Sequence, residues 1–424
     1  MKPQRHQVRQ LIDDVLRTDD EFSAFCIDEY PEIYRQFGTA MNRTTRVNAF
    51  LERVGDLGDV ICQMHRHVPN APAWKAFQAG PMASPDDPYH PEWYISRASI
   101  ESRAMDLLRR PGAPVILWGA ERCGKTWLLR KLVSNIQAEE GPSARIALIH
   151  LDEIVRDKPS DSNQLFRNFG LHLIDAFDST DDWAVEWPRW LGEAWEQIGG
   201  PMRKLKWLVQ QRLLPRCQNR LIIAIDGADV MVGSKFQNDF YGMLRGWSEG
   251  SLSSPFDRLR IIMAVSYSPS MLIEEVRQSP FNLTQPLIID DFSLEELEEL
   301  SWRYALFWSR NDVRQVFDLV GGHPYLARLI MHTVSQSKTS LIHILDKRTD
   351  ISKSLFEPFL SRYRSVLAEE KNAITVLRQI DQGSELSRDT RLLHRLERAG
   401  LIIRDPARGA PRLRCSLYRS LFEA

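Results

Sequence analysis

Two glycines, a lysine and a threonine stand at a fixed spacing in one short segment of the chain. The segment reads Gly119, Ala120, Glu121, Arg122, Cys123, Gly124, Lys125 and Thr126. It matches G-x-x-x-x-G-K-[ST], in which the glycines let backbone N–H groups surround the β- and γ-phosphates of a nucleotide. Lys125 would neutralise phosphate charge, and the Thr126 hydroxyl would ligate Mg²⁺. The sequence therefore predicts binding of ATP or ADP with Mg²⁺ along the segment from Gly119 to Trp127.

An aspartate directly follows the strongly apolar run Leu221–Ile225. At the carboxyl end of a buried strand, Asp226 would face the same sheet edge as the glycine-rich loop and hold the hydration shell of Mg²⁺. We therefore predict Asp226 as a catalytic residue and, together with Thr126, as a metal-site residue. Asp229 is a second catalytic candidate. Each aspartate has an alternative role as the cap of the following turn or helix.

The residue after Asp226 is Gly227. Proteins that hydrolyse ATP with this motif usually carry glutamate there, because its carboxylate orients the attacking water. Asp229 and Glu121 are candidate replacements. We expect an ATPase with slow hydrolysis, in which the nucleotide acts as a switch ligand.

The strand after this one ends near Ser266 and Ser268, where a polar group can contact the γ-phosphate of a nucleotide. A surface turn is the alternative for both serines. Three arginines are candidates for a catalytic finger that reaches a neighbouring subunit: Arg245, Arg258 and Arg260. Arg245 is our choice among them, although each has a structural or solvated role as its alternative.

Short apolar runs alternate with helical segments over the centre of the chain. The runs are Pro114–Trp118, Ile146–Leu151, Leu221–Ile225, Arg260–Val265 and Pro286–Ile289. Such runs are typical of a parallel sheet that is buried on both faces. We therefore predict an α/β P-loop NTPase core with a five-stranded parallel sheet over residues 93–292, in which the helix after the loop covers Trp127–Gln137.

Before this core, apolar residues fall at helical spacing without a strand pattern. Thr18 with Glu21 predicts a capping box, and Pro31 can begin a further helix. We predict an all-α bundle over residues 1–77. A linker rich in Pro, Asp and Gly follows at 78–92.

After the core, Ser293 with Glu296 predicts the cap of the first of several helices. We place a helical lid at 293–355 and a winged helix at 356–424. The winged helix is predicted from two helices and a two-stranded wing in that order. These elements are Ala368–Ile380, Leu386–Ala399, Leu401–Arg404 and Arg412–Leu417.

Composition limits the partners and the compartment. The formal net charge of −1 gives no global attraction to nucleic acid or anionic lipid. The five cysteines are scattered and form no C-x-x-C pair, which argues against a disulfide framework or a zinc site. No window approaches the length of a membrane span, and the first residues lack a signal-peptide pattern. We therefore expect a cytoplasmic protein without a membrane partner.

With these motifs placed, residues 94–335 resemble the AAA-like ATPase domains of the STAND type found in bacterial signalling and conflict proteins. The resemblance rests on Tyr94-Ile95-Ser96-Arg97, the two nucleotide motifs, Phe240–Trp247, Ser279–Asn282, Asp291-Phe292-Ser293 and Gly321–Leu326. It implies that Tyr94, Ile95 and Arg97 lie beside the adenine. It also implies that His323 and Pro324 close over the nucleotide. A helix end followed by a proline-started helix explains the last motif equally well.

The amino-terminal bundle resembles effector-associated, death-like adaptor domains through Phe25–Tyr34, Met41–Arg43 and Val47–Leu51. This resemblance implies docking to a matching helical domain on an effector protein. A bundle that merely packs on the ATPase is the alternative. Together, the parts predict an ATP-binding switch in bacterial defence or stress signalling that forms a homo-oligomer on activation. The rival functions are a multiple-turnover ATPase that remodels a partner and an initiator-like DNA-binding ATPase.

Arginines cover the predicted recognition helix and wing. They are Arg391, Arg395, Arg398, Arg404, Arg408, Arg412 and Arg414. Such a surface can meet DNA phosphates, but acidic residues are interleaved, and winged helices of STAND-type proteins more often serve as intramolecular latches. DNA is therefore the less favoured partner. The cluster Trp183, Trp187, Trp190 and Trp195 is interpreted as core packing, with an exposed oligomer or sensor surface as the alternative.

Overall fold

The computed structural model describes residues 4–77, 84–112, 114–141, 144–175, 177, 199–249, 255–267, 272, 285–337, 339–346, 349–370, 372–384, 390–404 and 409–422. Contacts divide the chain into two compact units. The lid unit comprises Met1–Ile95, Asp291–Glu385 and Leu413–Ala424, and the sheet unit comprises Ser96–Asp290 and Leu386–Arg412. The first unit thus joins the predicted bundle to the predicted lid, and our domain limits stay a prediction.

The sheet unit contains five parallel strands in the order β2-β3-β4-β1-β5. The strands are β1 Val115–Trp118, β2 Arg145–His150, β3 Leu221–Asp226, β4 Leu259–Val265 and β5 Leu287–Ile288. Every residue of β4 is buried, as are the first five residues of β3. Apolar side chains on both faces require a covering layer on each side of the sheet. The predicted five-stranded parallel sheet is confirmed.

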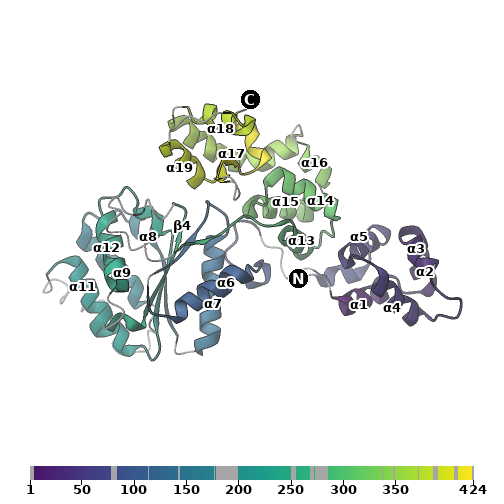
Figure 1. Cartoon of the computed structure of the whole chain (residues 1–424), viewed down its shortest axis with the longest axis horizontal. Helices are drawn as coiled ribbons and strands as arrows, with labels where there is room; N and C mark the ends of the chain where they lie inside the picture. The colour runs from purple at the N-terminus through teal and green to yellow at the C-terminus, as the bar shows by residue number, and fades with distance from the viewer. Residues whose placement is uncertain are drawn as a thin grey trace. The chain divides into compact units, whose positions relative to one another are not determined.

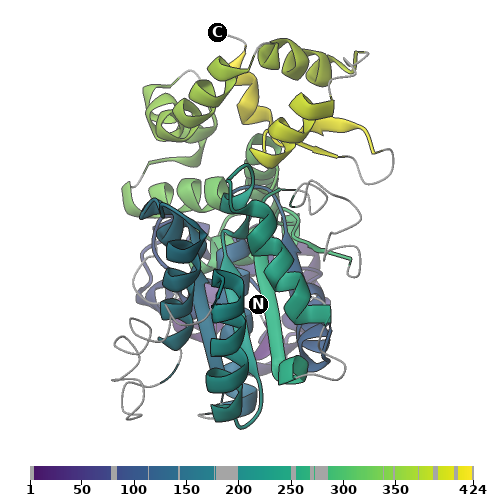
Figure 2. The ribbon, with the colours of Figure 1, turned by 90° about the vertical axis from the view of Figure 1, so that its left-hand side faces the viewer.

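Helices cover both faces of this sheet (Figures 1 and 2). On one side lie α6 Ala98–Arg109 and α7 Lys125–Glu140. On the other lie α8 Leu151–Arg156, α9 Ser162–Ile174, α11 Pro201–Leu208 and α12 Gln237–Glu249. Because all the strands run in parallel, their carboxyl ends meet at one edge, where the loop after β1 and Asp226 are found.

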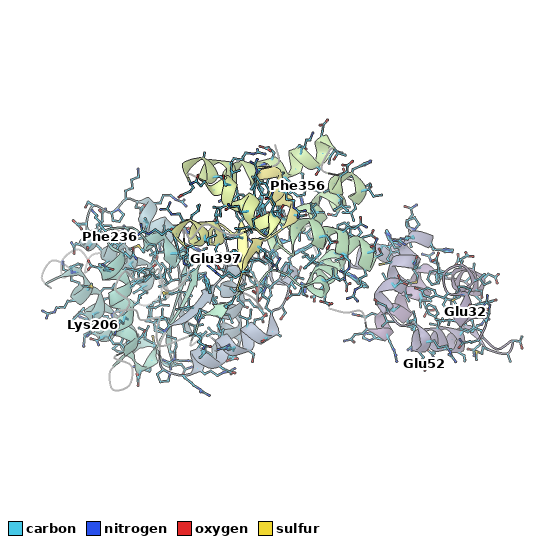
Figure 3. All side chains as sticks on the ribbon, turned by 45° about the horizontal axis from the view of Figure 1, so that its top comes forward. Glu32, Glu52, Lys206, Phe236, Phe356 and Glu397 are labelled. Carbon is cyan, nitrogen blue, oxygen red and sulfur yellow. The ribbon has the colours of Figure 1, made fainter. Side chains whose placement is uncertain are left out.

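The described residues of the amino-terminal part of the lid unit form helices. They are α1 Arg5–Val15, α2 Asp19–Glu29, α3 Pro31–Tyr34, α4 Arg43–Arg53, α5 Leu57–His67 and η1 Pro72–Phe77. The predicted capping box is present, because Thr18 and Glu21 each accept the other's backbone N–H through their side chains. A buried aromatic and aliphatic core holds the helices together, and Glu32 and Glu52 are exposed (Figure 3).

The lid helices are α13 Leu294–Arg303, α14 Arg310–Val320, α15 Pro324–Ser337 and α16 Leu341–Leu345. The predicted capping box at Ser293 and Glu296 is present. Between α14 and α15 the backbone of Gly322 has φ +78°, and a Cβ there would stand 2.1 Å from the carbonyl oxygen of Phe292. Only glycine allows this approach. The close approach joins the α14–α15 turn to the segment that begins the lid.

The lid also contacts the amino-terminal helices within the lid unit. Phe307 is buried in their core, and its ring centroid lies 4.9 Å from that of Trp74 and 5.0 Å from that of His65. The Cys62 thiol donates a hydrogen bond to the Trp308 carbonyl at 2.9 Å. Phe307 has φ +38°, a conformation that non-glycine residues rarely adopt. This contact therefore holds a strained lid turn in place.

The described part of the predicted linker is bonded to the lid. The Arg328 guanidinium donates to the carbonyl of Ser84 at 3.2 Å, and the Tyr325 hydroxyl lies 3.3 Å from the Asp86 carboxylate. Arg303 bonds the carbonyl of Glu92. Residues 84–92 are thus fastened to lid helices, whereas 78–83 lie outside the described residues.

The carboxyl-terminal elements differ in their bounds from our expectation. They are α17 Asp350–Glu369, α18 Ala373–Gln382, α19 Thr390–Arg398, β6 Ile402–Arg404, β7 Pro411–Leu413 and η12 Ser416–Leu421. The helix expected at Ala368–Ile380 is divided, because Asn372 takes a left-handed conformation with φ +72°. The proposed boundary at residue 355 falls inside α17. The two strands pair as expected, and the winged-helix interpretation stays a prediction.

Within the described residues, no helix combines the length and apolar character needed to cross a bilayer.

Candidate nucleotide-binding site

The glycine-rich loop lies between β1 and α7, the position that its motif requires. Lys125 is the first residue of α7, so the free N–H groups of the helix terminus open onto the loop. The Lys125 ammonium donates to the carbonyl oxygens of Gly119 and Ala120 at 3.0 and 2.7 Å. The loop is therefore curled round the cationic group that would meet a phosphate. Helix α7 begins two residues before the expected Trp127 and ends three after the expected Gln137.

Both motif glycines have a steric reason. A Cβ at Gly119 would lie 2.6 Å from the Cys123 sulfur and 2.8 Å from the Ile289 carbonyl oxygen. Gly124 has φ +97°, which favours glycine. Cys123 is buried in the loop, while Glu121, Arg122 and Trp127 are partly buried around it. The segment predicted from the motif is one continuous structural feature.

Four polar side chains converge at the carboxyl edge of the sheet. The Thr126 hydroxyl donates to Asp226 Oδ2 at 2.8 Å, which connects α7 to the end of β3. His150 is the register partner of Asp226 on β2, and its Nδ1 lies 3.5 Å from the same carboxylate oxygen. Arg130 Nη2 lies 3.1 Å from His150 Nε2. The two predicted metal-site residues are thus in direct contact.

These contacts affect both titrating groups. Burial alone would raise the pKa of Asp226, but hydrogen bonds from His150 and Thr126, with the charges of His150 and Lys125, hold that pKa below its ordinary value. The hydrogen bond to Asp226 raises the pKa of His150 against its own burial and the nearby Arg130 charge. The Asp226 carboxylate therefore stays ionised, which its predicted role at a metal requires.

A tight turn follows Asp226. Gly227 has φ +66°, and Asp229 lies in the short helix η6 Ala228–Met231. The buried Tyr241 of α12 donates its hydroxyl to the Ala228 carbonyl at 2.8 Å. This bond holds the turn against the covering helix. The catalytic role of Asp229 stays a prediction.

Arg97 is bonded to the loop from the side. Its guanidinium donates to the carbonyl of Cys123 at 3.1 Å and to that of Asp290 at 2.8 Å. Arg97 thus joins the glycine-rich loop to the residues after β5. Its predicted neighbours at the adenine, Tyr94 and Ile95, are buried in the lid unit, and their nucleotide contact stays a prediction.

His323 and Pro324 are buried in the lid unit, where the His323 ring meets Phe359 of α17 edge-on at 5.5 Å. Their predicted closure over a nucleotide stays a prediction. Arg245 is partly buried on α12, and its role as an arginine finger stays a prediction.

Ser266 is buried at the end of β4, at the same edge as Asp226. Arg258 and Arg260 belong to the opposite edge, where they donate to the carbonyls of Cys217 and Leu108 at 2.8 and 3.0 Å. Both arginines therefore have structural partners within their own chain. Ser268, Ser279–Asn282 and the tryptophans at 183, 187, 190 and 195 lie outside the described residues.

Residues 83–424 match the AAA-like domain family, which is most of the chain. The chain belongs to this family. A region of 153 residues, 35% of the chain, is 27% identical to an uncharacterised WD repeat-containing protein of Synechocystis sp.. The chain spans only 13% of that curated relative.

One solved structure supports the fold of the AAA-like domain. A Walker-type ATPase of Pyrococcus abyssi is similar with a TM-score of 0.55 and 16% identity, over 80% of this chain and 99% of that one. A STAND protein with a tetratricopeptide repeat sensor from Pyrococcus horikoshii has a TM-score of 0.38 and 15% identity, over 81% and 44%. The first likeness supports the P-loop ATPase fold of the AAA-like domain.

His150 and Arg130 are the site residues of this AAA-like domain that sequence reasoning missed. The predicted second strand includes Leu151, whereas β2 ends at His150 and α8 begins at Leu151. A polar residue at the carboxyl end of a parallel strand is a usable signal, because that edge carries the loop and Asp226. Arg130 lies five residues after Lys125 on α7 and has no comparable signal.

Proposed function

We propose that this chain is an ATP-binding molecular switch. In this proposal the nucleotide state controls opening and self-association of the AAA-like domain, and the amino-terminal bundle recruits an effector that carries a matching helical domain. The observation that carries the proposal is a complete phosphate loop whose Thr126 contacts Asp226, followed by Gly227 in place of a glutamate.

The residues at the sheet edge fit a nucleotide with Mg²⁺. The helix terminus and the Lys125 ammonium supply positive potential at the loop, and the Thr126 hydroxyl and Asp226 carboxylate are oxygen ligands of the kind that Mg²⁺ prefers. Bound Mg²⁺ would neutralise phosphate charge. Lys125 and the loop amides would hold the phosphates, while Thr126 and Asp226 would hold the metal and its water.

Slow hydrolysis follows from the turn after Asp226. Gly227 has no side chain, and its left-handed backbone is strained for any other residue. Asp229 is the nearest acidic residue that follows, but it belongs to η6 beyond the turn. Without a carboxylate directly after Asp226, water near the γ-phosphate lacks the usual orienting base. Bound ATP would therefore persist long enough to define a state.

The test is to measure binding and turnover on the same full-length protein. We expect ATP with Mg²⁺ to bind at one site per chain, phosphate release below about 1 s⁻¹, and self-association by light scattering with ATP but not with ADP. Turnover of order 1 s⁻¹ or faster that falls sharply in Asp226→Asn and Asp229→Ala would instead support a remodelling ATPase. Absence of ATP binding would refute both functions.

A contact within the sheet unit supports the closed state of this switch. Arg398 of α19 lies over the ring of Tyr267, with 3.6 Å from the guanidinium carbon to the ring centroid, and bonds its hydroxyl. Tyr267 comes two residues after β4, at the edge that carries Asp226. We therefore propose that α19 acts as a latch on this edge.

Replacing Arg398 with alanine should release the latch. A cation–π contact contributes about 1 kcal/mol, so we expect ADP to dissociate about fivefold faster from the variant. Stopped-flow fluorescence with a fluorescent ADP measures this dissociation rate. Arg391→Ala is the matched control, because Arg391 is exposed on the same helix. Equal rates of ADP release from Arg398→Ala and Arg391→Ala would show that α19 does not act as a latch.

The contact of Phe307 and Trp308 with the amino-terminal helices supports a resting form in which the bundle is held on the lid. Part of the α5 surface is covered in that form. We propose that opening frees this surface for the effector domain.

The observations favour a latch over an initiator-like DNA binder. Arg398 bonds Tyr267, Arg404 Nε lies 3.3 Å from the Glu397 carboxylate (Figure 3 labels Glu397), and Arg414 is buried. Arg391 and Arg395 stay exposed on α19. DNA affinity that falls steeply with salt and on charge reversal of these two arginines would favour the rival function.

A further inference from the structure

The proton on the His150 ring can be assigned from its two neighbours. Arg130 Nη2 and His150 Nε2 are 3.1 Å apart. A guanidinium can only donate, so Nε2 must accept. The neutral ring therefore carries its proton on Nδ1, which lies 3.5 Å from Asp226 Oδ2. Arg130 therefore donates to His150, and His150 donates to the Asp226 carboxylate, which accepts.

The His150 ring faces the same carboxylate oxygen of Asp226 that accepts the Thr126 hydroxyl. Asp226 Oδ2 accepts the Thr126 hydroxyl at 2.8 Å and faces His150 from the neighbouring strand. The backbones of β2 and β3 are in register at His150 and Asp226, so the histidine is fixed by the sheet itself. With Oδ2 held between two donors, Oδ1 is the carboxylate oxygen left for the metal's water. If the carboxylate rotated, Oδ1 would no longer face the metal's water.

We propose that His150 is a positioning residue of the nucleotide site, which orients the Asp226 carboxylate for Mg²⁺ while Arg130 sets the ring tautomer. This inference rests on the proposed binding of Mg·ATP. It concerns the metal alone, because neither His150 nor Arg130 bonds the glycine-rich loop within the described contacts. Partners of this outer kind typically change metal affinity by about 10- to 100-fold when they are removed.

Two substitutions of His150 both introduce a side-chain amide but place its N–H donor at different positions. The side-chain nitrogen of asparagine overlays Nδ1 of histidine, whereas that of glutamine overlays Nε2. His150→Asn therefore keeps a donor facing Asp226, and His150→Gln moves it to the Arg130 side. His172→Gln is the matched control, because His172 lies on α9, away from the strand ends.

The experiment measures ATP affinity of the full-length protein by calorimetry, in EDTA and across a Mg²⁺ series, with a thermal melt of each variant without nucleotide. We expect His150→Gln to need about 10-fold more Mg²⁺ for half of the affinity gain, with the EDTA affinity unchanged. His150→Asn and His172→Gln should follow the wild type. Arg130→Met keeps the His150 ring as a possible donor but no longer fixes its tautomer. Its Mg²⁺ requirement should therefore lie between those of His150→Gln and the wild type.

Several outcomes would overturn the inference. A wild-type Mg²⁺ response in His150→Gln removes the role of His150, and an equal loss in His150→Asn removes the role of the Nδ1 donor. Loss of affinity in EDTA, or a lowered melting temperature that accounts for the change, shows a structural role instead. A wild-type protein that does not bind ATP refutes the proposed function itself, which is distinguishable from all of these.

Discussion

Lys125→Ala is expected to abolish ATP binding while the chain stays folded. The Lys125 ammonium bonds only loop carbonyls among its described partners, at 3.0 and 2.7 Å, and the side chain is partly exposed. Its removal therefore disturbs little of the core. Charge-assisted bonds to phosphate contribute about 1.5 to 3 kcal/mol each, so loss of two weakens binding by about 100-fold or more.

Calorimetry with Mg·ATP measures this loss directly, and far-UV circular dichroism checks the fold. Lys131→Ala is the control, because Lys131 lies on the same helix away from the loop. The wild type and the control should self-associate with ATP, and Lys125→Ala should not. Unchanged ATP affinity in Lys125→Ala would refute the switch mechanism, since the nucleotide would then be held elsewhere.

The sequence predicts the parts of this site that depend on local order. The glycine-rich loop needs a strand before it and a helix after it, and both are recognisable within about 30 residues of sequence. Asp226 is found for the same reason, since an acidic residue ends an apolar run. The five strands follow from the runs of apolar residues. These features depend on neighbours along the chain.

The features that the sequence did not predict depend on neighbours in space. His150 meets Asp226 only because β2 and β3 pair in one register. Arg398 and Tyr267 are separated by 131 residues, and nothing in either segment indicates the other. Asn372 divides a helix whose periodicity is otherwise unbroken, because a left-handed residue leaves little trace in the pattern.

A buried ion pair in the lid unit carries the largest stability effect that we expect. The Arg414 side chain is 1% exposed and that of Asp291 is 12% exposed. Arg414 Nε donates to Asp291 Oδ2 at 2.7 Å, and a second bond joins Nη2 to Oδ1. Asp291 begins the lid, and Arg414 follows β7, so the pair joins segments that are 123 residues apart.

Asp291→Ala should destabilise the lid unit by about 3 to 5 kcal/mol, because it leaves the buried guanidinium without its carboxylate. Urea unfolding followed by tryptophan fluorescence measures this change, since Trp302 and Trp308 both lie in this unit. Asp381→Ala removes the partner of Arg419, whose side chain is 46% exposed, so we expect less than about 1 kcal/mol there.

The double variant Asp291→Leu with Arg414→Met distinguishes the effect of an unpaired buried charge from the effect of lost side-chain packing. Replacing both charges by apolar side chains of similar size is often neutral, so the double variant should recover most of the stability lost in Asp291→Ala. If Asp291→Ala were no worse than Asp381→Ala, the guanidinium would have other compensation, and the ion pair would not join the lid to the carboxyl-terminal segment. If the double variant were as unstable as Asp291→Ala, the bidentate geometry rather than charge burial would account for the effect.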